Sequence, residues 1–114
     1  MTKEFCGKVA FVTGGARGIG AAYAMSKAAL QGLVRGMARD LGPKGITVNN
    51  VQPGPTNTDM NPEHGEFGGA LHGLMAIQRH AHPDEIAGLV AYVASSEAGF
   101  VTGANLSIDG GFSA

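Results

Sequence analysis

The sequence lacks the features that are typical of several broad classes of protein. Cys6 is the single cysteine, which excludes a disulfide framework and favours a reducing, cytoplasmic compartment. Charged residues make up only 15% of the chain and the net charge is −1, without the basic excess that is typical of nucleic-acid binding. No apolar run approaches the length of a membrane-spanning helix, and the first residues lack the apolar core of a signal peptide. We therefore expect neither a nucleic-acid partner nor a membrane partner.

Three short apolar runs predict a parallel β-sheet inside one α/β domain over residues 1–114. Helical patterns separate them, so we expect the strand order 1-2-3 with right-handed crossovers and helices mainly on one face. A parallel sheet normally has both faces covered, so a second copy of the chain is expected to cover the other face in a dimer or tetramer. The predicted strands are Lys8–Val12, Ile46–Val51 and Ala104–Ile108, and the predicted helices run from Gly18 or Ile19 to Leu41 and from Pro83 to about Ser95.

The first of these helices carries two stripes of side chains. A large apolar stripe that includes Val34 and Leu41 is expected to face the core, whereas Ala24, Gly32 and Gly36 belong to a stripe of small residues. The small stripe either packs on the sheet or pairs with a second helix. A helix of roughly 24 residues is about 36 Å long, whereas a strand of this length spans about 20 Å. The helix must therefore overhang the sheet, bend, or pack on a partner. Further along, residues 59–80 are expected to form a lid-like connection.

Two motifs that indicate a chemical function follow the first strand. Thr13–Gly20 reads TGGARGIG, a glycine-rich turn of the kind that lets a backbone approach a pyrophosphate at a helix N-terminus. Tyr23 and Lys27 then stand four residues apart, so they share one helix face.

Together with Pro53-Gly54-Pro55-Thr56 and the closing Asp109-Gly110-Gly111, these motifs resemble the short-chain dehydrogenase/reductase family in their order. The resemblance covers nearly the whole chain. It implies a truncated Rossmann-like fold of two or three layers and hydride transfer between NADP or NAD and a small carbonyl or alcohol substrate. Within the family, the segments 52–59 and 74–80 are similar to a bacterial member that binds cyclic-di-GMP.

The resemblance also implies roles for individual residues. Tyr23 would be the catalytic acid/base, and Lys27 would assist it and bind the nicotinamide ribose. Arg17 stands where family members often contact the 2′-phosphate, which favours NADP over NAD. The cofactor-binding residues implied by the resemblance are Gly14, Arg17, Gly18, Ile19 and Gly20 in the first turn, and Pro53, Gly54, Thr56 and Thr58 in the second.

Several parts of the family pattern are missing. The family separates the glycine turn and the Tyr/Lys pair by a long segment, whereas here only Ala21 and Ala22 stand between them. The catalytic Ser and Asn have no counterpart, and neither has the residue that reads the adenine ribose. We therefore expect weak or lost activity. Two alternatives stay open: a non-catalytic module that binds a dinucleotide or cyclic-di-GMP, and an oligomeric remnant without a ligand.

Four histidines stand close together in the sequence, at positions 64, 72, 80 and 82. Their spacing matches no common metal-ligand pattern, and no cysteine or acidic residue completes a set. We therefore expect solvated histidines and no metal site.

Overall fold

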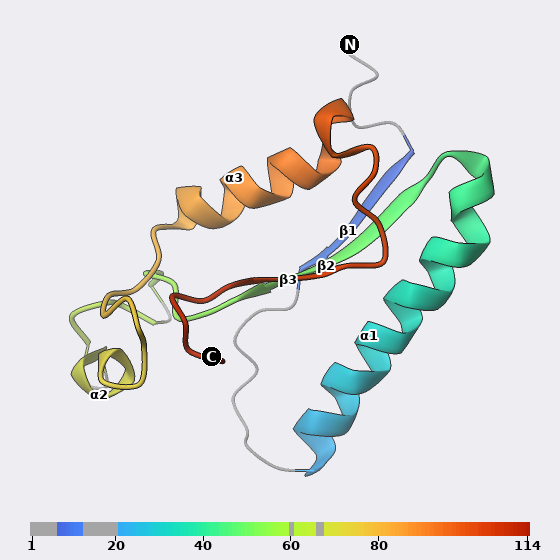
Figure 1. The fold of residues 1–114 in the computed structure, drawn as a ribbon. Coiled ribbons are helices and arrows are strands. Elements are labelled where there is room, and N and C mark those ends of the chain that lie inside the picture. The colour runs from blue at the N-terminus through green and yellow to red at the C-terminus, as the bar shows by residue number, and fades with distance from the viewer. Residues whose placement is uncertain (1–6, 13–20, 60, 66–67) are drawn as a thin grey trace.

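A computed structural model describes residues 7–12, 21–59, 61–65 and 68–114, and its centre is a parallel three-stranded sheet (Figure 1). The strand order is β1-β2-β3, as predicted. β2 is the central strand, with Val12 of β1 opposite Val51 and Ile108 of β3 opposite Pro53. The strands are β1 (Lys8–Val12), β2 (Thr47–Pro53) and β3 (Asn105–Ile108), and the helices are α1 (Ala21–Leu41), α2 (Gly68–His72) and α3 (Pro83–Ala94).

The helices cover both faces of the sheet, so the prediction of helices mainly on one face was wrong. Figure 1 shows the sheet running between α1 and α3, and α1 contacts β2 whereas α3 contacts β1 and β2. Val48 is fully buried in a cluster with Val34 and Ala38 of α1. Val51 is also fully buried, and it points to the opposite face because successive strand side chains alternate.

Two consecutive parallel crossovers that use opposite faces must have opposite hands, so one of them departs from the right-handed rule. The connection from β2 to β3 runs through residues 54–104 and contains both α2 and α3. A connection of that length can reach either face of the sheet. The face that was expected to need a second copy is therefore covered by α3 of the same chain.

α1 buries only part of the predicted apolar stripe, which runs from Leu30 to Leu41. Its buried residues are Val34 and Ala38, and Leu33 remains 50% exposed. The stripe of small residues faces away from the sheet, because a methyl group added at Gly32 or Gly36 would meet no neighbouring segment within 4 Å. With 21 residues, α1 is about 31 Å long. Its early turns therefore extend beyond its packing on β2, as predicted for an overhanging helix.

The chain beyond β2 is tied back to the sheet at several points. Asn49 is buried, donates to Val101 O at 2.9 Å and accepts from Ala104 N at 3.2 Å, which holds the approach to β3. α3 begins with a capping box, in which the backbone N–H of His82 donates to Glu85 at 2.9 Å. Among the helices that the structure describes, none combines the length and apolarity needed to cross a membrane.

Candidate functional site

All three strands end at one edge of the sheet, which we call the carboxyl edge. β1 ends at Val12 beside Val51, and β2 ends at Pro53 beside Ile108. β1 therefore ends at the same edge as the turn that begins with Gly54, and the glycine-rich motif 13–20 follows β1 in the sequence. In open parallel α/β sheets ligands bind outside the carboxyl ends of the strands, so a ligand site is expected at this edge.

Gly54 follows β2, and its backbone lies against the end of β3. Its N–H donates to Ile108 O at 3.0 Å, and a Cβ at this position would lie 2.6 Å from Asp109 Cα. A side chain cannot be added here without separating backbone from backbone. Gly54 is thus required by packing, whatever else it binds.

The two threonines of this turn are engaged within the chain. Thr56 donates its hydroxyl to Gly54 O at 2.9 Å, and its backbone pairs with Ala81 in an isolated bridge. Thr58 is exposed, and its hydroxyl accepts a hydrogen bond from Asn61 N at 3.1 Å. These bonds fix the turn that leads away from β2.

A second turn at the carboxyl edge is built on Asp109. Its carboxylate accepts hydrogen bonds from Ser113 Oγ at 2.6 Å and from Gly111 N at 3.0 Å, and these bonds, Ser113 foremost, hold the pKa of Asp109 below its usual value. Gly110 and Gly111 have φ values of 61° and 83°, which favour glycine. Ile77 N donates to Gly110 O at 2.8 Å. Part of the lid-like segment 59–80 is therefore bonded to the carboxyl edge.

Tyr23 and Lys27 lie side by side on α1, as their spacing predicts. The Lys27 ammonium is 5.8 Å from the centroid of the Tyr23 ring, and both residues are half-buried. The ammonium lies over the face of the aromatic ring, as in a cation–π contact. The nearby Ser26 hydroxyl donates to the backbone carbonyl of Tyr23 at 2.8 Å and not to its phenol oxygen.

The structure groups only some of the predicted site residues. Pro53, Gly54 and Thr56 lie together at the carboxyl edge, and Tyr23 and Lys27 lie together on α1. Among the described residues, no hydrogen bond joins the pair on α1 to the turn after β2. Thr58 lies further along the turn after β2 and is exposed. The other predicted cofactor residues lie outside the described residues: Gly14, Arg17, Gly18, Ile19 and Gly20.

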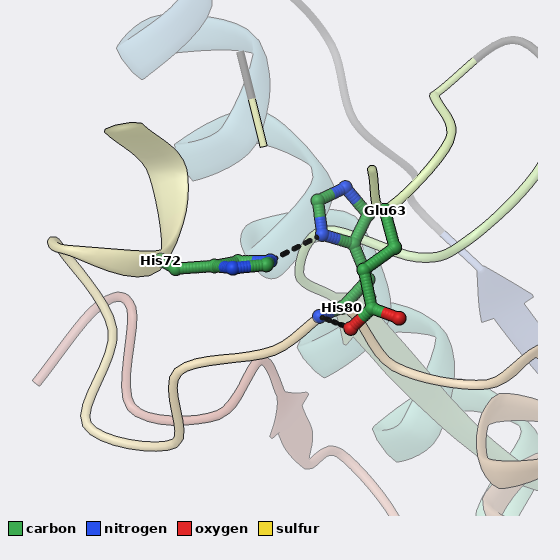
Figure 2. A group of neighbouring side chains, drawn as sticks. All are labelled: Glu63, His72 and His80. Atoms are coloured by element: carbon green, nitrogen blue, oxygen red, sulfur yellow. Dashed lines mark hydrogen bonds between the residues drawn. The ribbon is translucent and has the colours of Figure 1, made fainter. Parts of the chain in front are cut away.

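A third group of side chains was not foreseen from the sequence. His72 Nε2 lies 2.9 Å from His80 Nδ1, and the Glu63 carboxylate accepts a hydrogen bond from the backbone N–H of His80 at 3.0 Å (Figure 2). One potential ligand atom from each of the three residues lies within 4.8 Å of the other two. The expectation that no acidic residue joins the histidines was therefore wrong. Glu63 is nine residues before His72, a spacing without any local pattern that could have revealed it.

His80 is the most enclosed member of this group. It is 2% exposed, and its Nε2 has no hydrogen-bond partner among the described residues. Burial, and next the neighbouring His72, lower the pKa of His80, which favours the neutral imidazole. The rings of His72 and His80 meet edge to face with centroids 5.0 Å apart.

An ion pair holds the segment beside this group. Arg79 binds Glu85 through two hydrogen bonds of 2.7 and 3.0 Å and also donates to His80 O at 3.1 Å. The hydrogen bond from Arg79 is the main reason that the pKa of Glu85 falls to about 2. The pair joins the start of α3 to the residues before it.

Comparisons with known proteins identify a matching family and similar relatives. Residues 9–113 match a family model described as enoyl-(acyl carrier protein) reductase. The cyclic-di-GMP-binding biofilm dispersal mediator protein of Escherichia coli K12 is 62% identical over 94 residues, which are 82% of this chain and 40% of the relative.

Solved structures also match most of the chain. A short-chain dehydrogenase/reductase from Serratia marcescens BCRC 10948 matches with a TM-score of 0.85 and 57% identity, over 94% of this chain and 46% of that one. BdcA in complex with NADPH matches with a TM-score of 0.82 and 52% identity, over 92% of this chain and 45% of that one. The chain thus spans less than half the length of these relatives.

Proposed function

The chain belongs to the short-chain dehydrogenase/reductase family, and on that premise we propose that it is an NADP-binding module of this lineage. One observation carries the proposal. β1 ends at Val12, which pairs with Val51 three residues before Gly54, and the glycine-rich motif 13–20 follows β1 directly in the sequence. The family binds NAD(P), and its solved members include complexes with NADPH and NADP. The pyrophosphate would lie against the segment 13–20, with the Pro53–Thr58 turn available to the nicotinamide.

Calorimetric titration of the purified chain tests cofactor binding. We expect micromolar binding of NADPH and weaker binding of NADH, because Arg17 would contact the 2′-phosphate. Arg17→Ala should then weaken NADPH binding by about tenfold or more and leave NADH binding unchanged. Arg35→Ala is the matched control, since Arg35 is an exposed residue on α1. Failure of the chain to bind either dinucleotide would refute the proposal.

We further propose that hydride transfer to a carbonyl substrate is weak or lost in this chain. Tyr23 and Lys27 retain their mutual placement, but the catalytic Ser and Asn have no counterpart in the sequence. Catalysis depends on holding the hydride donor, acceptor and proton source in register. NADPH oxidation with a panel of small carbonyl compounds should be slow, and Tyr23→Phe should remove it whereas Tyr92→Phe should not. Robust turnover by the 114-residue chain would contradict this expectation.

A second candidate function is binding of cyclic-di-GMP without chemistry. It is favoured by the 62% identity to a protein named for that ligand. The calorimeter separates the two candidates: cyclic-di-GMP would bind in place of NADPH and no turnover would follow. Saturation with one nucleotide before titration with the other reports whether they share a site.

We also propose that the chain forms homo-oligomers in the cytoplasm through the outer face of α1. That face carries Met25, which is 70% exposed, and the open positions of Gly32 and Gly36. Small residues at this spacing let two helices approach closely. Light scattering should report a dimer or tetramer, and Gly32→Arg should produce monomers. A monomeric wild-type chain would refute the proposed oligomer.

A further inference from the structure

The cluster of Glu63, His72 and His80 lies in the long connection between β2 and α3. We propose that these three side chains form a binding site for a divalent transition metal ion such as Zn²⁺. Figure 2 shows the two imidazoles facing each other and the Glu63 carboxylate bonded to the backbone N–H of His80, with the three side chains coming from separate stretches of backbone. No role proposed above uses this cluster, and the site stands independently of nucleotide binding.

The donor atoms already lie near the spacing that a metal imposes. With Zn–N bonds of about 2.0–2.1 Å, two ligands of a tetrahedral site are separated by roughly 3.3 Å. His72 Nε2 and His80 Nδ1 are 2.9 Å apart, and one potential ligand atom from each of the three residues lies within 4.8 Å of the other two. A metal ion would therefore widen the first separation by about 0.4 Å and draw the carboxylate inward. Side-chain rotation can supply movements of this size.

The type of donor selects the type of metal. Two imidazoles with one carboxylate suit Zn²⁺ and its first-row neighbours, whereas Mg²⁺ and Ca²⁺ prefer oxygen ligands. Three protein ligands leave a fourth tetrahedral position open, which a water molecule can take. Two facing imidazole nitrogens can share only one proton between them, but each can offer its lone pair to a cation.

The backbone holds each donor in place before any metal arrives. Glu63 N donates to Asn57 Oδ1 at 2.9 Å, and His80 N and O are both bonded, to Glu63 and Arg79. His72 ends α2, and its carbonyl accepts from Met75 N at 3.1 Å. Pre-positioned ligands reduce the ordering needed on binding. The bound metal would fix loop 61–65 and α2 against the segment that precedes α3.

Metal titration of the chelator-treated chain tests this site. We expect one Zn²⁺ per chain by calorimetry, and Co²⁺ in the same site should give visible absorption bands of tetrahedral coordination. His72→Asn and Glu63→Gln should each weaken binding by about 100-fold or more, since loss of even an outer partner of a ligand costs 10–100-fold. Circular dichroism of both variants verifies that they are folded.

The matched control is His82→Asn, which removes a nearby histidine but keeps a residue type able to cap α3. This variant should bind Zn²⁺ within about twofold of the wild-type chain, and Zn²⁺ should raise the melting temperature of both. Three results would overturn the proposal: no Zn²⁺ binding by the wild-type chain, undiminished binding by folded His72→Asn and Glu63→Gln, or loss of binding in His82→Asn. The last two would assign the ion to exposed histidines such as His64, whose side chain is 95% exposed.

Discussion

The substitution Gly54→Ala tests whether the carboxyl edge depends on close backbone approach. An added Cβ would lie 2.6 Å from Asp109 Cα, whereas ordinary contacts begin at 3.4 Å, so the two chain segments must separate by 3.4 − 2.6 = 0.8 Å. The Gly54 N–H···O=C Ile108 bond, now 3.0 Å, would then stretch toward about 3.8 Å and be lost. Overpacking costs about 1–3 kcal/mol and a hydrogen bond about 0.5–1.5 kcal/mol, so we expect a loss of about 2–4 kcal/mol in unfolding free energy.

Urea denaturation followed by circular dichroism measures this loss. Gly88→Ala in α3 is the matched control, because the same methyl group meets no atom within 4 Å there. At an exposed helix position the replacement of glycine by alanine stabilises by about 0.5–1 kcal/mol. The two variants should therefore shift the midpoint in opposite directions. Equal stability of Gly54→Ala and the wild-type chain would refute the reasoning about close approach at the carboxyl edge.

Three further predictions concern the core, the buried polar bonds and an ion pair. Val48→Ala removes two fully buried methyl groups next to α1 and should cost about 2–3 kcal/mol by urea denaturation; a loss below about 1 kcal/mol would mean that the core collapses around the gap. Asn49→Ala leaves Val101 O and Ala104 N without their partner and should cost about 2–4 kcal/mol, with hydrogen exchange at Ala104 as a local readout. Glu85 has a pKa lowered from 4.5 to about 2, so its ion pair with Arg79 contributes stability above pH 4.5 that is lost as the pH falls toward 2. In Glu85→Gln the melting temperature should therefore drop less between about pH 6 and pH 3 than in the wild-type chain, and an equal drop would contradict the assignment.

Local sequence patterns predicted the elements well, because short apolar runs and helix stop signals act over a few residues. The strand Lys8–Val12, the end of α1 at Leu41 and the start of α3 at Pro83 were all predicted at the observed residue. The pairing of Tyr23 with Lys27 also followed from helical periodicity alone. The predicted second strand began one residue early and stopped two residues before Pro53, because a proline at a strand end gives no signal of continuation.

Contacts between distant segments were the part that local patterns could not supply. The side of the sheet taken by α3 depended on the path of residues 54–104, which no local pattern describes. The meeting of Glu63 with His72 and His80 depended on loop closure, which brings together residues that share no helical or strand period. Periodicity determined which residues form each element and which neighbours share a face. Only tertiary packing decided what each face touches, because burial and hydrogen bonding are shared between segments that the sequence keeps apart.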